Sequence, residues 1–365
     1  MTDPESPAPA SRRERQERDR SQARTRVNRK GETVRRRRRW PWVVGSIVLV
    51  LAIAGGGGFW YVQHVRSTLA DVQRLGDDVF PGDETDRVED AAPDALNILL
   101  LGSDSRGALP TDIAEVAERS DTIMVAHIPA DRQSVQIMSI MRDSYVDIPG
   151  YGTDKINAAL SEGGVQLTVQ TVESLIGDRI DHIAVLGFDS FGAITDVLGG
   201  ITVQNDYSFR PSELREAYFE KGQLTLNTGE EALSFVRERK AFPDGDYQRV
   251  RNQQYFIKGM LEKMLEVGAL SNPVILEQLL SAMQPYMALD NGLSTRTMID
   301  LAGELGEIPV EDVTFFTMPT LGTGTERGQS VVYVNDEWVD LLAEHFAADD
   351  LDTFLVKPVE DDEAE

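Results

Sequence analysis

A loop that holds one carboxylate and one guanidinium is the first place in this 365-residue sequence that core formation does not explain. Asp104 and Arg106 lie between Gly102 and Gly107, directly after the apolar run 99–101. A loop at the carboxyl end of a strand is a common position for a binding site. It lacks the Gly-Lys-Ser/Thr of a Walker loop, and it has Asp104 where a nucleophile elbow has serine. The loop indicates a polar ligand site, and an ordinary turn with an exposed ion pair is the alternative.

Other aspartates and arginines follow at the ends of predicted strands and at a helix start. Four arginines lie within the fifteen residues 237–251, in a part of the chain that is otherwise strongly acidic. Guanidinium forks match phosphate or carboxylate oxygens, and carboxylate oxygens suit Mg²⁺ or Mn²⁺. A solvated helix face with ion pairs to Glu238 and Asp246 is the alternative for this stretch. The whole set predicts a metal-assisted phosphate site built from Asp104, Arg119, Asp121, Arg142, Arg237, Arg239, Asp246, Arg249 and Gln253.

Composition narrows the chemistry further. The chain has no cysteine, which excludes a disulfide scaffold, a thiolate zinc site and a cysteine nucleophile. No two of its four histidines stand at metal-ligand spacing, so a histidine-based zinc site is not expected. A Ser-His-Asp triad stays open, although packing or surface roles explain each histidine more simply. With 41% hydrophobic residues, the chain has ample material for a core.

The elements that must position the site alternate between strands and helices. Short apolar runs predict the strands, and apolar positions at helical spacing predict the helices. This order predicts an α/β (α/β/α) fold, with a central mixed β-sheet covered by helices, in one domain over residues 96–346. The strands are expected at 97–101, 122–128, 134–140, 182–186, 201–203 and 313–318, and the helices at 165–176, 190–198, 232–238, 250–265, 294–305 and 335–346.

The N-terminal part predicts a membrane anchor. Residues 1–39 hold 13 Arg, and residues 43–62 carry no charge over a length that crosses a hydrocarbon core. Because positive residues stay inside, the leader 1–39 is expected in the cytoplasm, the single span at 40–62, and the remainder outside the cell. A cleaved signal peptide is the rival interpretation, because Ala52-Ile-Ala54 has the small-x-small form. The leader lacks interleaved aromatics, so no nucleic acid partner is expected.

Two polar segments flank the predicted domain. Residues 63–95 are acidic, contain Pro81-Gly82 and show no sustained apolar period, which is typical of an extracellular stalk. Residues 347–365 are interpreted as an acidic C-terminal tail.

Several motifs follow one another along the chain, namely LLLGSDSRG, RSDTIMVAHI, SIMRDSYVDIPG, KINAAL, HIAVLGFDSFGAITDVLGGITV and ALSFVRERKAFPDGDYQRVRNQQ. In this order they resemble the LytR-CpsA-Psr (LCP) family of membrane-anchored cell-wall enzymes. The resemblance covers residues 97 to about 260, and the layout of leader, span and extracellular domain is also the family's usual one.

The resemblance implies an LCP-type fold and a phosphotransferase. Such an enzyme moves a glycopolymer from a polyprenyl pyrophosphate carrier to a peptidoglycan hydroxyl through a phosphodiester, with the lipid in an apolar pocket between sheet and helices. The implied metal ligands are Asp104 and Asp121. The implied pyrophosphate-binding arginines are Arg119, Arg142, Arg237 and Arg239, and Asp246, Arg249 and Gln253 match the polar residues of the family's helix motif.

Two departures from the family pattern stand out. Met141 occupies a position where the family usually has proline, and residues 107–118 form a longer stretch between the two metal-site motifs. A polyprenyl-phosphate-binding envelope regulator without turnover and a polyprenyl pyrophosphatase are the alternatives that the same residues allow. Transfer of the glycopolymer to an acceptor hydroxyl would distinguish the transferase from both alternatives.

Overall fold

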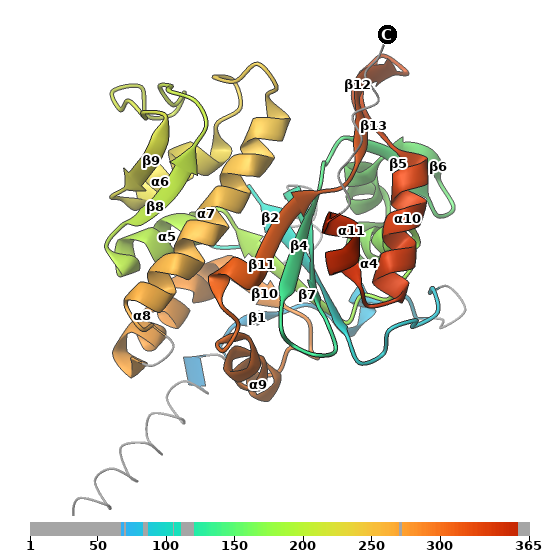
Figure 1. The fold of residues 1–365 in the computed structure, drawn as a ribbon, viewed down its shortest axis with the longest axis horizontal. Coiled ribbons are helices and arrows are strands. Elements are labelled where there is room, and N and C mark those ends of the chain that lie inside the picture. The colour runs from blue at the N-terminus through green and yellow to red at the C-terminus, as the bar shows by residue number, and fades with distance from the viewer. Residues whose placement is uncertain are drawn as a thin grey trace, which may run out of the picture. The chain divides into compact units, whose positions relative to one another are not determined.

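Apolar runs in the chain form a seven-stranded mixed sheet in the computed structural model (Figure 1). The structure describes residues 67–68, 71–82, 87–104, 106–110, 120–269 and 272–356. The central strands β2, β3 and β4 are antiparallel neighbours, whereas β2 pairs with β7 in parallel. In sheet order the strands are β1 (Gln73–Arg74), β10 (Met287–Leu289), β7 (His182–Gly187), β2 (Leu96–Ser103), β3 (Ser120–Ile128), β4 (Val135–Ile140) and β11 (Val313–Thr317).

Helices cover both faces of this sheet, because both faces of its central strands are apolar. Ile123 and Val125 pack on one face, against α4 (Ile156–Ile176), α10 (Asp336–Ala347) and α11 (Leu351–Val356). Met124 and Ala126 face the other side. That side carries α5 (Asp189–Leu198), α6 (Gly229–Arg237), α7 (Asp246–Glu266), α8 (Pro273–Met283) and α9 (Thr295–Leu305). The predicted α/β/α arrangement is confirmed.

Two smaller sheets extend the fold, and of their strands the sequence predicted only the one at 201–203. A four-stranded sheet has the order β12 (Thr320–Glu326), β13 (Gln329–Val334), β5 (Ser144–Ile148) and β6 (Gly152–Lys155). A hairpin joins β8 (Ile201–Asn205) to β9 (Gly222–Leu226). Most of these strands are short and polar on one side, so their apolar pattern is too weak to predict them.

Side chains and glycines at the helix ends set the bounds of several helices. The Thr228 side chain accepts a hydrogen bond from the Glu231 backbone N–H and caps the start of α6. Gly199 ends α5 at a positive φ of 72°, where a side chain would be strained. The helix predicted from residue 165 begins earlier, at Ile156, with non-helical backbone at Gly164.

Both predicted domain boundaries are wrong. The stalk interpretation of residues 63–95 fails from residue 71 onward, because β1 joins the sheet and Val72, Leu75 and Val79 are buried. The acidic tail interpretation fails for residues 351–356, where Leu351 and Phe354 pack into the main core. In both segments a few apolar residues bury themselves among many polar ones, which a period search does not detect.

The predicted leader at 1–39 and span at 40–62 lie outside the described residues. Within the described ranges, no helix is long and apolar enough to cross a membrane.

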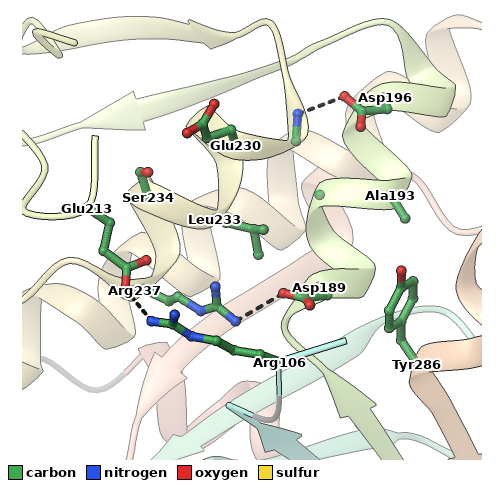
Figure 2. A pocket seen from close by; sticks show the side chains of 12 residues that line it. Arg106, Asp189, Ala193, Asp196, Glu213, Glu230, Leu233, Ser234, Arg237 and Tyr286 are labelled. Carbon is green, nitrogen blue, oxygen red and sulfur yellow. Dashed lines mark hydrogen bonds and ion pairs between the residues drawn. The ribbon is translucent and has the colours of Figure 1, made fainter. Parts of the chain in front are cut away.

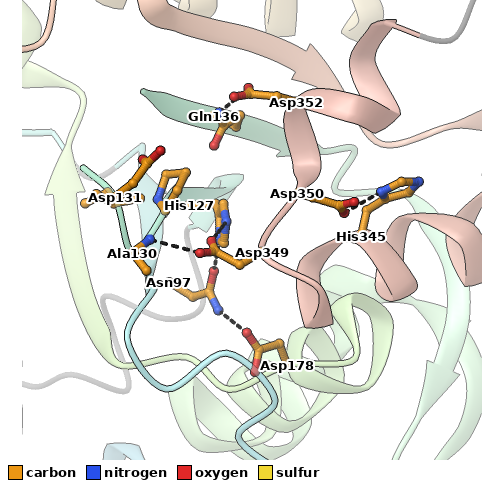
Figure 3. A network of polar contacts seen from close by, with 12 residues as sticks. Asn97, His127, Ala130, Asp131, Gln136, Asp178, His345, Asp349, Asp350 and Asp352 are labelled. Carbon is orange, nitrogen blue, oxygen red and sulfur yellow. Dashed lines mark hydrogen bonds and ion pairs between the residues drawn. The ribbon is translucent and has the colours of Figure 1, made fainter. Parts of the chain in front are cut away.

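A buried polar network fastens the end of α10 to the central sheet (Figure 3). His127 on β3 is fully buried, with its Nδ1 atom 2.8 Å from Asn97 Oδ1 and its Nε2 atom 3.1 Å from Asp349 Oδ1. Asp349 Oδ2 also accepts the Ala130 N–H at 3.0 Å. Burial lowers the pKa of His127, and the Asp349 carboxylate opposes this effect. Asp349 therefore connects the turn between α10 and α11 to β3.

Replacement of this carboxylate tests the connection. Asp349→Ala leaves the Ala130 N–H and the His127 ring without their partner and is expected to lower the free energy of unfolding by about 1–3 kcal/mol. Asp349→Asn keeps an acceptor and tolerates the positive φ of 53° at this position, so it should retain most of the stability. Urea unfolding followed by circular dichroism compares both variants with wild type. Equal stability of Asp349→Ala and wild type would contradict the connection.

Candidate functional site

The geometry of β2 and β3 brings the first two predicted residues together. The strands are antiparallel neighbours, with Gly102 opposite Thr122, so Asp104 at the end of β2 and Asp121 near the start of β3 meet at one edge of the sheet. A Cβ atom on Gly102 would lie 2.7 Å from Thr122 Cβ, so this close approach requires glycine.

A pocket of about 330 Å³, which we call the charged pocket, opens at this edge of the sheet. Its basic lining residues outnumber its acidic ones, although the chain as a whole has a net charge of −25. The predicted local concentration of positive charge is therefore present. Its lining comprises Arg215, Arg237, Arg239, Lys240 and Arg249, the acids Asp104, Asp121, Glu213 and Glu238, and Phe188, Ser212 and Ser234.

Arg237 connects both walls of the charged pocket. It is the last residue of α6, and its side chain is 13% exposed. Its Nε atom lies 2.8 Å from Asp104 Oδ1, without hydrogen-bond geometry, and its Nη2 atom donates to Asp189 Oδ1 at 3.1 Å. Asp189 Oδ2 in turn accepts the Gly107 N–H at 2.6 Å. Asp189 thus positions both the arginine and the loop that carries Asp104.

A second network surrounds Asp121. Arg142 donates to Asp121 Oδ1 at 2.5 Å, and Arg249 Nη1 lies 3.7 Å from Asp121 Oδ2. Asp246, the first residue of α7, lies 3.5 Å from Arg142, 3.5 Å from Arg239 and 3.6 Å from Arg249. Burial acts to lower the pKa of Arg142, but Asp121 and the other carboxylates outweigh it and raise that pKa. Burial lowers the pKa of Arg249 despite Asp246.

These arginines have more donors than the described chain has acceptors for them. The Nε atoms of Arg142, Arg237 and Arg249 are buried and have no hydrogen-bond partner within the described ranges. A buried donor without an acceptor costs free energy. An anionic ligand in the charged pocket would supply hydrogen-bond acceptors to these donors.

Asp104 and Asp121 both line the charged pocket. Burial raises the pKa of Asp104, the Asp121 charge adds to this effect, and Arg237 opposes it. The described residues contain no group of three or more histidine and acidic side chains that could hold a metal ion. A cation here would therefore have two protein ligands at most, which is the arrangement that Mg²⁺ accepts together with water and phosphate oxygens.

Apolar space begins directly beside the charged pocket. An inner apolar cavity of about 160 Å³ lies between the sheet and α5, α7 and α8, and it shares Phe188 with the charged pocket. An outer apolar cavity of about 310 Å³ shares Leu100 with the inner one and extends between the sheet, α7 and α9. The expected apolar space between sheet and helices is therefore present.

Most predicted site residues converge here, with two exceptions. Arg119 lies outside the described residues. Gln253 is 1% exposed and lines the inner apolar cavity, where its Oε1 atom accepts a hydrogen bond from Thr122 at 3.1 Å. Met141, at the family's usual proline position, is buried against Val250 and Val332, and Arg142 still reaches Asp121.

Sequence reasoning missed the function of Glu238 within this site. It was considered only as an ion-pair partner, yet its carboxylate accepts five hydrogen bonds and forms no ion pair in the described part of the chain. Its Oε2 atom accepts from the N–H and hydroxyl of Ser212. Its Oε1 atom accepts from the backbone N–H groups of Arg239, Lys240 and Ala241. Glu238 therefore holds together the two segments that face each other across the charged pocket.

The hydrogen bonds on Glu238 also fix its charge. Burial acts to raise the pKa of Glu238, but the hydrogen bonds from Ser212 and the backbone outweigh it and lower that pKa below its ordinary value. Because the folded-state pKa is lowered, the stabilisation is complete above the unfolded-state pKa and is lost as the pH falls through the folded-state value.

Comparison with known proteins identifies relatives over most of the chain. A model of the LytR_cpsA_psr family matches residues 66–345. The polyisoprenyl-teichoic acid–peptidoglycan teichoic acid transferase TagU of Halalkalibacterium halodurans is 31% identical over 234 residues, which are 63% of this chain and 72% of that protein. The cell wall biosynthesis protein LcpA of Corynebacterium glutamicum is 30% identical over 335 residues, 80% of this chain and 62% of that protein.

Solved structures share the fold. A structure of TagT bound to LIIa-WTA superimposes with a TM-score of 0.58 at 25% identity, and the match covers 73% of this chain and 96% of that one. The crystal structure of Bacillus subtilis TagT gives a TM-score of 0.57 at 24% identity, over 76% and 99% of the two chains.

The role of Glu238 is testable through ligand binding and stability together. Glu238→Gln loses the charge and at least one acceptor, so it should lower the free energy of unfolding by about 1–3 kcal/mol. It should also weaken binding of inorganic pyrophosphate, measured by calorimetry, because Arg239 and the Ser212 segment lose their fixed positions. Ser212→Ala, which removes one of the five hydrogen bonds, is the matched control and should have the smaller effect. Unchanged pyrophosphate affinity in Glu238→Gln would rule out the positioning role.

Proposed function

This chain belongs to the LytR-CpsA-Psr family, and we propose that it transfers a glycopolymer from a polyprenyl pyrophosphate carrier to a hydroxyl of peptidoglycan. The observation that carries the proposal is the direct contact between a pocket rich in arginine and an apolar cavity, joined at Phe188. A lipid pyrophosphate likewise consists of a charged pyrophosphate joined directly to an apolar chain. The names of the relatives TagU and LcpA support the same activity.

The arginines bind the pyrophosphate and hold it in one orientation. Guanidinium groups form charge-assisted hydrogen bonds with phosphate oxygens. The surrounding carboxylates offset the repulsion between neighbouring guanidinium groups and so keep them close together. The lipid lies along the inner apolar cavity, whose wall includes Gln253. The proposed pyrophosphate-binding residues are Arg119, Arg142, Arg237, Arg239, Arg249 and Gln253.

The reaction exchanges one phosphorus–oxygen bond for another. The acceptor hydroxyl oxygen forms a bond to the phosphorus that carries the glycan, and the bond from this phosphorus to the bridging oxygen breaks. The electron pair leaves on the lipid monophosphate, where the arginines stabilise the growing negative charge. The hydroxyl proton passes to a carboxylate, for which Asp104, Asp121 and Asp246 are the candidates.

A divalent cation, Mg²⁺ or Mn²⁺, completes the proposed site. Asp104 and Asp121 are the residues that would hold it, and their mutual repulsion and partial exposure suit a hard cation. When bound, the ion neutralises charge on the pyrophosphate.

We place this chemistry on the outer surface of the cell membrane. The Arg-rich leader at 1–39 would stay in the cytoplasm, and the segment 40–62 would anchor the catalytic domain outside. Lipid carrier and peptidoglycan are both reached from that side.

Removal of individual arginines tests the assignment. Arg237→Ala and Arg239→Ala should each lower the transfer rate by about 100-fold, because each removes a donor to the departing phosphate, while the domain stays folded. Arg296→Ala, at a 90% exposed side chain on α9, is the matched control and should keep full activity. The assay follows lipid monophosphate and linked product by mass spectrometry, with a short glycan on polyprenyl pyrophosphate and peptidoglycan fragments. Full activity of either pocket variant would refute its role, and phosphate release without a linked product would indicate a pyrophosphatase.

Metal removal tests the cation independently. Transfer should cease after treatment with a chelator and return on addition of Mg²⁺. Asp104→Asn and Asp121→Asn should each require a higher Mg²⁺ concentration for half-maximal activity, because each removes one charged ligand. Activity that persists in protein shown by elemental analysis to be free of metal would remove the cation from the proposal and leave the transferase assignment intact.

A further inference from the structure

A wide, solvent-open hollow of about 780 Å³ lies between α5 and α6, beside the charged pocket (Figure 2). We call it the acidic hollow. Helix α5 contributes Asp189, Ala193 and Asp196, and α6 contributes Glu230, Leu233 and Ser234. The other lining residues are Arg106, Gly192, Glu213, Gly229, Arg237 and Tyr286.

The two helices that line the hollow contact each other through glycine. A Cβ atom on Gly229 would lie 2.7 Å from the Gly192 carbonyl oxygen, which leaves no room for a side chain. The Gly229 N–H also donates to Asp196 Oδ1 at 2.7 Å. This close packing and the hydrogen bond join α5 to α6 beside the hollow.

The hollow connects to the charged pocket and not to the apolar cavities. It shares Glu213, Ser234 and Arg237 with the charged pocket. It shares no described lining residue with either apolar cavity. A lipid pyrophosphate that enters from Phe188 therefore has the lipid on one side of the charged pocket and the hollow on another.

The lining chemistry suits a sugar and does not suit a further phosphate. Its four carboxylates outnumber its two arginines, and both arginines are already paired, Arg106 with Glu213 and Arg237 with Asp189. Ser234 is 4% exposed and lines both the hollow and the charged pocket. Carboxylate and hydroxyl oxygens bind sugar hydroxyls, and the side chains of Leu233, Ala193 and Tyr286 offer apolar surface to a ring.

The geometry of phosphoryl transfer decides which sugar enters. The attacking and leaving oxygens lie roughly in line through the phosphorus. The leaving oxygen belongs to the lipid phosphate, on the side of Phe188, so the attacking hydroxyl approaches from the opposite side. The donor glycan is attached to the same phosphorus at an angle to this line.

From these observations we infer that the acidic hollow is the binding site for the saccharide that supplies the acceptor hydroxyl, a glycan strand of peptidoglycan. The inference rests on the proposed function and adds the position of its second substrate. Ser234 and Glu230 hold the acceptor ring by its hydroxyl groups, and Glu213 and Ser234 stand at the junction with the charged pocket.

Two variants test the acceptor site. Ala193→Trp fills the hollow, and Glu230→Gln replaces a carboxylate that would accept sugar hydroxyls. Each variant should raise the KM for peptidoglycan fragments about tenfold and leave both kcat and the Kd of the lipid-linked donor within twofold of wild type. The control is Glu216→Gln, an exposed acid outside both pockets, which should leave both substrates unaffected.

A direct binding measurement separates this inference from the proposed function. Calorimetry with a peptidoglycan tetrasaccharide, without donor, should detect binding to wild type that is lost in Ala193→Trp and retained in Glu216→Gln. Equal tetrasaccharide affinity and equal acceptor KM in the two hollow variants and wild type would overturn the inference while transfer by wild type still supports the proposed function. A raised donor Kd with an unchanged acceptor KM would assign the hollow to the donor glycan and also overturn it. If wild type binds the tetrasaccharide in the hollow but transfers no glycan, the proposed function fails and the saccharide site stands.

Discussion

The mutual repulsion of closely placed guanidinium groups is the constraint that the rest of this site must satisfy. Arg142, Arg239 and Arg249 all lie within 3.5–3.6 Å of the Asp246 carboxylate. Such a cluster survives only where carboxylates, helix ends and strand ends fix each positive group in place. The fold provides this by directing the ends of β2 and β3, the end of α6 and the start of α7 to one point. Carboxylates such as Asp121 and Asp189 then hold the arginines in place but leave some of the guanidinium N–H donors without an acceptor.

Much of this arrangement could be predicted from sequence, because the central elements have strong apolar patterns. The strands β2, β3 and β7 contain short apolar runs, and β4 alternates in period two. Several residues that the motifs singled out lie at the ends of these strands. The arginines of the stretch 237–251 could be predicted as a group, because positive charge is rare in this part of the chain. Arg119 and the segment 40–62 lie outside the described residues, so those expectations stay predictions.

The unpredicted parts depend on contacts between distant segments. Glu238 stands between two arginines in sequence, yet its partners include Ser212, 26 residues away. Asp189 looks like an ordinary first-turn acid of a helix, and only the structure shows that it binds both Arg237 and Gly107. The strand β1 has two residues, and its pairing with β10 joins positions more than 200 residues apart. Apolar periodicity within a short stretch of sequence cannot reveal contacts between such distant segments.

The position of β1 has a mechanical consequence. This strand is at the edge of the main sheet, and its parallel pairing with β10 is reinforced where Leu75 donates to the Leu289 carbonyl and Arg74 donates to the carbonyls of Asp290 and Leu293. Tension applied to the chain before residue 71 enters the fold here and loads these hydrogen bonds together, in shear along the strand. The first force-bearing contact is thus distant in the sheet from β3, which carries Asp121, so a pull on the N-terminal side reaches the edge strands before the charged pocket.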